Sequence, residues 1–160
     1  MRVLGIDPGF ERLGIAVLEK TTSGKERVLF SECFKTAPSL EFSGRLRRIG
    51  EEIEKIINTY KPNMLAMETL FLNTNQKTAM RVAEARGVVL LKAAEAGLKI
   101  FEASPPEVKA AVAGDGRADK KQMMKMVKML LKMEEEKRSD DEMDAIAMAL
   151  ACLAQANRSL

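Results

Sequence analysis

The chain has 160 residues, 46% of them hydrophobic and 31% charged, which fits one globular domain with its own core. It contains no histidine and two cysteines, so Ser-His-Asp triads and histidine-bearing zinc sites are excluded. The net charge of +3 permits a polyanionic partner without requiring one. The apolar runs are too short to cross a bilayer, and the chain starts directly on a strand pattern. With its unpaired thiols, the protein is expected in the cytoplasm, without a membrane partner.

Three short apolar segments open the chain and predict strands at Val3–Ile6, Leu13–Leu18 and Arg27–Phe34. Because tight turns separate them, they should form an antiparallel meander. Apolar residues then recur at helical spacing from Phe42 to Tyr60. This helix should end before Pro62, since the residue before a proline disfavours helical geometry.

The second half of the chain alternates strands and helices. It predicts strands at Met64–Glu68 and Lys99–Ala103, and helices at Gln76–Ala96, from Ser104 to Ala113, at Asp119–Met133 and at Met143–Ala156. The capping box Ser139-Asp140-Asp141-Glu142 should open the last of these helices. Methionines recur at helical spacing in the third of these helices, which is typical of core packing. The order is βββ-α-β-α-β-α-α-α. We expect one domain over residues 1–156 and a short tail over residues 157–160.

The long helix Gln76–Ala96 has two apolar faces, whereas a surface helix usually needs one. The first face holds Ala79, Val82, Val89, Ala93 and Ala96, and the second holds Met80, Ala83, Gly87, Leu91 and Ala94. Either the same helix of a second subunit or the last helix of the chain should cover the second face.

Acidic residues stand at the ends of apolar segments. Asp7 closes the first strand, Glu68 closes the fourth, and Asp141 and Asp144 open the last helix. Four carboxylates around one core would repel one another, so a cation is expected among them. Without histidine its ligands would be oxygens, which favours Mg²⁺, Mn²⁺ or Ca²⁺. Two such ions about 4 Å apart would serve phosphoryl chemistry.

The acids of the last helix also have a simpler interpretation, because carboxylates complement the dipole of a helix N-terminus. We prefer it for Asp140 and Glu142, and the metal for Asp144. Between Asp140 and Asp141, the spacing of three residues to Asp144 favours Asp141 as the ligand. Separately, the strand, acid and glycine turn from Gly5 to Gly9 also occur in actin-like ATPases, which would predict nucleotide binding. Those proteins need two such domains.

Six short motifs follow one another along the chain. They are Leu4-Gly5-Ile6-Asp7-Pro8-Gly9, Glu68 with Phe71 and Asn75, Ala85-Arg86-Gly87-Val88, Pro106 with Val108 and Lys109, Gly114 with Gly116, Ala118, Lys120 and Gln122, and Asp141 with Asp144 and Ala145. Together they resemble the RuvC family of crossover junction endodeoxyribonucleases. The resemblance implies an α/β RNase H-like fold. Its five-stranded mixed sheet would have three antiparallel and then two parallel strands, flanked by helices.

The resemblance also implies a function, which is resolution of four-way (Holliday) DNA junctions by paired symmetric nicks in recombination and repair. Two Mg²⁺ per site are implied, with Mn²⁺ as a substitute. The partners would be junction DNA, a second copy bound through the helix Gln76–Ala96, and a branch-migration complex. The site residues carried over by motif are the catalytic and metal-binding Asp7, Glu68, Asp141 and Asp144, and the DNA-binding Phe71, Lys109 and Lys120.

Two alternatives of other kinds accompany this hypothesis. The chain could be an RNase H-like protein that binds nucleic acid without cutting it, but such a protein is expected to have lost carboxylates, and all four are present. It could also be a relative that processes RNA, which only a comparison of substrates would distinguish. For Phe71 the alternative is a core position, and for Lys109 and Lys120 it is an ordinary solvated helix face.

Overall fold

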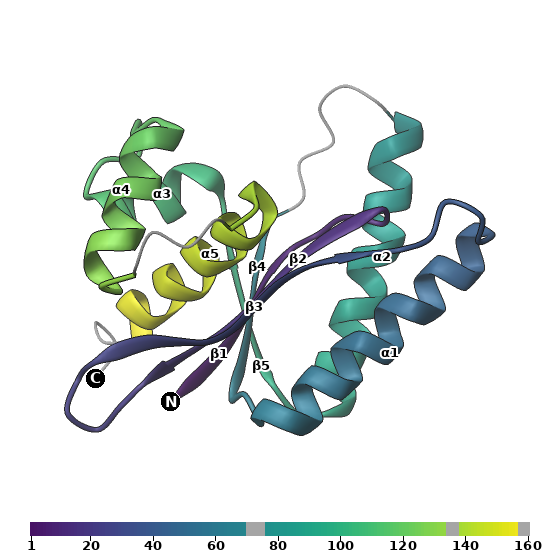
Figure 1. Ribbon diagram of the computed structural model, residues 1–160, viewed down its shortest axis with the longest axis horizontal. Coiled ribbons are helices and arrows are strands. Elements are labelled where there is room, and N and C mark those ends of the chain that lie inside the picture. Colours follow the sequence, from purple (N-terminus) through teal and green to yellow (C-terminus); the bar gives the residue numbers. More distant parts are fainter. Residues whose placement is uncertain (70–75, 134–137, 157–160) are drawn as a thin grey trace.

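Figure 1 shows the fold, a computed structural model that describes residues 1–69, 76–133 and 138–156. Its strands form one sheet in the order β3-β2-β1-β4-β5. They are β1 (Arg2–Asp7), β2 (Arg12–Lys20), β3 (Glu26–Lys35), β4 (Met64–Glu68) and β5 (Lys99–Ala103). The first three pair antiparallel, and β4 runs parallel to both β1 and β5. The predicted mixed sheet is therefore confirmed.

Helices cover both faces of this sheet (Figure 1). They are α1 (Phe42–Tyr60), α2 (Gln76–Glu95), α3 (Pro105–Ala113), α4 (Lys120–Leu130) and α5 (Asp140–Ala156). In Figure 1, α1 and α2 lie on one side of the sheet, and α3, α4 and α5 lie on the other. The predicted order of elements is confirmed. Within the described ranges no helix is long and apolar enough to span a membrane.

The alternation of side chains along β1 builds a separate core on each face. Val3 packs in the core that contains α5, whereas Leu4 and Ile6 pack in the core that contains α1. Successive strand residues point to opposite faces, so both sets are fully buried. Burial of one such aliphatic side chain contributes about 1.5–3 kcal/mol. Packing on both faces thus holds strand β1 in place, and it also fixes the position of Asp7 at the end of this strand.

Helix α5 lies unusually close to the sheet because glycines face it. A Cβ atom on Gly5 would stand 2.2 Å from the carbonyl oxygen of Ala145, and one on Gly14 would stand 2.1 Å from that of Asp141. Contacts this short are impossible for any side chain, so glycine is required for this approach. The first turns of α5 consequently lie against the ends of β1 and β2.

The second apolar face of α2 is open. Of its large side chains, Met80 is 65% exposed and Leu91 is 57% exposed, and Gly87 is exposed as well. The expectation that the last helix covers this face is wrong, because α5 packs on the opposite face of the sheet (Figure 1). The reason is the pair of close glycine contacts, which bind α5 to β1 and β2 instead.

Helix α4 is shorter than predicted, and helix α5 begins where its capping box predicts. Helix α4 ends at Leu130, short of the predicted Met133, because Lys132 takes a left-handed conformation (φ 48°) that a helix cannot continue. Helix α5 begins at Asp140, directly after Ser139, so the predicted capping box at its start is confirmed. The Ser139 hydroxyl and backbone N–H both donate to the Glu142 carboxylate, a capping arrangement that holds this first turn. The predicted tail at residues 157–160 lies outside the described residues.

Candidate active site

Asp7 and Glu68 are brought together by the pairing of β1 with β4. These strands are parallel, with Ile6 opposite Met67, so their last residues lie at the same edge of the sheet. Ala66 on β4 packs in the core on the α5 side. Because side chains alternate, Glu68 faces that same side, and Asp7 does so two residues after Gly5. The register therefore directs both carboxylates towards α5.

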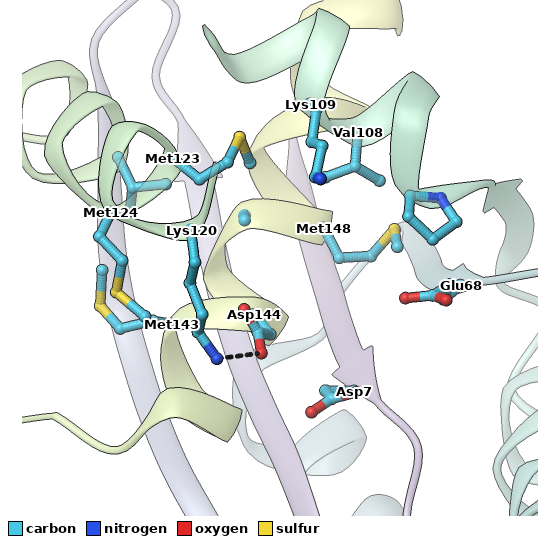
Figure 2. A pocket seen from close by; sticks show the side chains of 13 residues that line it. Asp7, Glu68, Val108, Lys109, Lys120, Met123, Met124, Met143, Asp144 and Met148 are labelled. Carbon is cyan, nitrogen blue, oxygen red and sulfur yellow. Dashed lines mark hydrogen bonds and ion pairs between the residues drawn. The ribbon is translucent and has the colours of Figure 1, made fainter. Parts of the chain in front are cut away.

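Helix α5 supplies the third carboxylate, from Asp144 (Figure 2). Asp7, Glu68 and Asp144 line one cavity of about 310 Å³ between the sheet edge and helices α3, α4 and α5. The other residues that line it are Pro105, Val108, Lys109, Lys120, Met123, Met124, Val127, Met143, Ala147 and Met148. The three carboxylates thus share the cavity with two lysines, and its other side chains are apolar.

Mutual repulsion and desolvation raise the pKa of these three acids. Burial raises the pKa of Asp7 to about 7, with further contributions from the charges of Asp144, Asp141 and Glu68. Burial, followed by the charge of Asp144, also raises the pKa of Glu68. Partial desolvation raises the pKa of Asp144, although Lys120 opposes the shift. Carboxyl groups in this state gain from a cation that replaces their protons.

Lys120 provides one cation at this edge. Its Nζ lies 3.5 Å from Asp144 Oδ2, drawn as the dashed line in Figure 2, and 3.1 Å from Asp140 Oδ2. The side chain of Lys109 reaches the cavity from α3 (Figure 2). Asp140 is therefore paired with a lysine and does not line the cavity. Phe71, which was predicted to contact DNA, lies outside the described residues.

Asp141 differs from the other three acids. Its Oδ2 accepts hydrogen bonds from the Arg12 guanidinium, including Nε at 3.0 Å, and from Cys33 Sγ at 3.4 Å. Burial alone would raise the pKa of Asp141, but the bonds from Arg12 and Cys33 outweigh it and lower that pKa. Asp141 is absent from the lining of the cavity. Of the four carboxylates expected to converge, the structure thus gathers three and holds the fourth against Arg12.

The donor set fits a divalent cation that prefers oxygen. Three carboxylates with raised pKa face one cavity, and neither cysteine lines it. As their side chains stand, no three Asp, Glu, Cys or His residues within the described ranges are close enough to hold an ion. An ion could be held only if the carboxylates came closer together than they stand in this structure.

Sequence reasoning missed two features of this site. Met123 and Met124 were assigned to core packing; they do pack against the core, but they also line the cavity. The contacts of Arg12 and Cys33 with Asp141 were not anticipated. A signal for Cys33 was available in the meander, because Gly14 pairs with Asp7 on one side and with Cys33 on the other. For Arg12 no local pattern indicates the contact.

Almost the whole chain is similar to one known protein family. The family model described as crossover junction endodeoxyribonuclease RuvC matches residues 3–152. A protein of that name from Halothermothrix orenii is 45% identical over 150 residues, covering 94% of this chain and 90% of the relative.

Solved structures give the same result. A Thermus thermophilus RuvC structure superimposes with a TM-score of 0.90 at 34% identity, covering 99% of this chain and 97% of the other. The T. thermophilus RuvC in complex with a Holliday junction substrate superimposes with a TM-score of 0.93 at 34% identity, covering 99% and 96%. The yeast mitochondrial Holliday junction resolvase, at 15% identity and a TM-score of 0.67, shares the fold.

Proposed function

This chain belongs to the RuvC family of crossover junction endodeoxyribonucleases, and we propose that the carboxylates around its cavity form the metal-dependent catalytic site. The protein is an RNase H-like endonuclease that hydrolyses phosphodiester bonds and resolves Holliday junctions. The observation that carries the site assignment is the meeting of Asp7, Glu68 and Asp144, from two strands and a helix, at one cavity. Asp141 is the proposed fourth ligand.

Family membership implies dependence on a divalent metal, and we propose that the ions are two Mg²⁺, with Mn²⁺ able to substitute. The proposed ligands are all carboxylate oxygens, which both ions accept. When bound, such ions acidify a water molecule and stabilise the leaving oxygen in a phosphoryl displacement. The carboxylates contribute position and negative charge, and the apolar wall excludes competing water from them.

The two lysines of the cavity are proposed to bind DNA phosphate. Lys120 stands beside Asp144, and Lys109 approaches from the opposite helix, so a phosphate at the carboxylates would meet positive charge on that side (Figure 2). An ammonium group that donates to a phosphate oxygen offsets the negative charge that the acids concentrate. Phe71 remains our proposal for the aromatic residue that stacks on bases near the branch point.

We further propose a homodimer, formed through the open face of α2. The exposed Met80, Gly87 and Leu91 lie on one side of this helix, and a second copy would bury them. Two sites related by twofold symmetry suit a substrate that is cut in two strands. A branch-migration complex is the proposed macromolecular partner beyond DNA, and the cytoplasm is the proposed location.

A comparison of substrates tests this function. A labelled four-way DNA junction, a linear duplex and an RNA–DNA hybrid would each be incubated with the protein in Mg²⁺ and in chelator. Paired symmetric nicks in the junction alone, dependent on Mg²⁺, are expected. Preferential cutting of the hybrid, or equal cutting in chelator, would contradict the proposal.

Asp140 and Asp141 can be separated by one further pair of variants. Asp141→Asn should reduce junction cleavage strongly, whereas Asp140→Asn should reduce it little, because Asp140 pairs with Lys120 outside the cavity. The reverse order of effects would identify Asp140 as the ligand.

A further inference from the structure

We propose that Arg12 competes with a divalent cation for Asp141, so that the two metal positions of the site fill unequally. The inference rests on the proposed function, because it assumes that the carboxylates bind metal. Arg12 is not among the proposed metal ligands or DNA-binding residues. Arg12 is thus proposed as a positioning residue, acting through Asp141.

The contact is a fork from one guanidinium to one oxygen. Both Nε and Nη2 of Arg12 donate to Asp141 Oδ2, and the Cys33 thiol donates to the same atom. A cation that binds through this oxygen must displace these donors or share the oxygen with them. The other three acids have no such arginine partner within the described part of the chain, so they meet an incoming cation unpaired except for Lys120 at Asp144.

Asp141 is nevertheless within reach of the other acids. Its main-chain carbonyl lies so close to Gly14 that a Cβ there would stand 2.1 Å away, and the same Cβ would stand 3.0 Å from the Cβ of Asp7. The backbone of Asp141 therefore already lies beside Asp7. What keeps its carboxylate from the cavity is the direction of the side chain, which the bond to Arg12 fixes.

Competition fits this geometry better than assistance. An ionised carboxylate only accepts hydrogen bonds, so any group that orients it as a metal ligand is a donor, and a neutral donor leaves the charge of the carboxylate available to the cation. Arg12 is instead a donor with a full positive charge, which repels a metal ion and withdraws electron density from the oxygen. Its side chain is also 51% exposed, so it can move into solvent when a cation arrives. The first ion would then bind at Asp7, Glu68 and Asp144, and the position that needs Asp141 would fill last.

Binding of Mn²⁺ to the intact protein tests the proposal without relying on activity. Mn²⁺ would be titrated into the parent and its variants while free ion is followed by electron paramagnetic resonance. Arg12→Ala should tighten the weaker class of site by roughly three- to tenfold, as expected for loss of one unit charge near a divalent ion in solvated surroundings. The tighter class should change less than about twofold by the same reasoning. Arg12→Gln also removes the positive charge, and it should tighten the weaker class of site by a similar factor.

Arg27→Ala is the matched control. Arg27 makes the same forked contact, with Nε at 2.9 Å and Nη2 at 2.6 Å from Glu19 Oε2, on β3 away from the cavity. This variant removes the same charge and should leave Mn²⁺ binding as in the parent. A matching fall in the Mg²⁺ concentration for half-maximal junction cleavage is expected for Arg12→Ala and Arg12→Gln, and not for Arg27→Ala.

The possible outcomes distinguish a failure of the Arg12 role from a failure of the proposed metal site. Suppose that the parent binds Mn²⁺ and cuts junctions. Unchanged or weaker Mn²⁺ binding by both Arg12→Ala and Arg12→Gln would then overturn the role of Arg12 alone. Two equal classes of site in the parent would overturn it as well. A parent that binds no Mn²⁺ would overturn both this inference and the proposed metal site.

Discussion

At the scale of single residues, the site is a set of acids whose charges are compensated to different degrees. Asp141 is neutralised by Arg12, Asp144 in part by Lys120, and Asp7 by no cation that contacts it within the described residues. Asp7 and Glu68 were predictable because each closes an apolar strand. Arg12 was not, since its partner lies 129 positions away and only the packing of α5 on β2 brings them together.

Asp7 makes the stability of the metal-free protein depend on pH. Its pKa is about 7 in the fold against 3.8 for the ordinary group, so the folded state binds more protons between these values. Stability should therefore fall as pH rises from about 4 to 7 and then level off. Asp7→Asn should lose the contribution of Asp7 to this fall, so its free energy of unfolding should exceed that of the parent at pH 8. Urea unfolding in chelator across this pH range measures the free energy of unfolding of both proteins. A difference between them that stays the same at every pH would refute the raised pKa of Asp7.

Lys120 should matter for cleavage more than its neighbour. Loss of a hydrogen bond to a charged group costs about 1.5–3 kcal/mol, so Lys120→Ala should slow single-turnover junction cleavage by roughly 10–100-fold. Lys121→Ala removes the same charge from an exposed position that does not line the cavity, and it should stay within about threefold of the parent. Equal effects in both variants would mean that Lys120 contributes only to the general surface charge.

At the scale of elements, the approach of α5 to the sheet decides the site. Strand alternation and helical spacing predicted the order of elements, because each has a strong apolar period. They did not predict which face of the sheet α5 covers, since that depends on contacts between Gly5, Gly14 and backbone atoms far along the chain. The same contacts leave α2 uncovered, which the apolar pattern alone could not decide.

Gly5→Ala tests this approach. A methyl group on Gly5 would meet the carbonyl oxygen of Ala145, so α5 must shift and the free energy of unfolding should fall by about 1–3 kcal/mol or more. Gly44→Ala is the control, because its nearest neighbours stand at 3.7 Å and alanine favours a helix by up to about 1 kcal/mol. Denaturant unfolding compares them. A Gly5→Ala protein as stable as the parent would show that α5 does not depend on this close contact.

At the scale of the whole molecule, the open face of α2 is a feature that packing within the described part of one chain does not explain. Met80 and Leu91 are both exposed on the same face of this helix, and a second copy would cover them. The sequence indicated this by the second apolar face, but it could not choose between a partner subunit and α5. The position of α5 removes the second choice.

The dimer is tested by placing a charge on that face. Gly87→Glu should raise the dimer dissociation constant by at least about tenfold, because an unpaired carboxylate would be buried against the partner. Ser43→Glu adds the same charge to an exposed position of α1 and should leave assembly unchanged. Sedimentation equilibrium reports both values. A parent that sediments as a monomer at micromolar concentration would contradict the interface.

The most direct test of the central claim is single-turnover cleavage of a four-way junction by Asp144→Asn, with Asp115→Asn as its control. Asp115 is an exposed loop carboxylate that accepts from the Arg117 N–H, a bond that asparagine also accepts. We predict that Asp144→Asn binds the junction but loses cleavage by at least about 10³-fold, while Asp115→Asn cleaves as the parent does. Cleavage by Asp144→Asn at the parent's rate would show that this cavity is not where the DNA is cut.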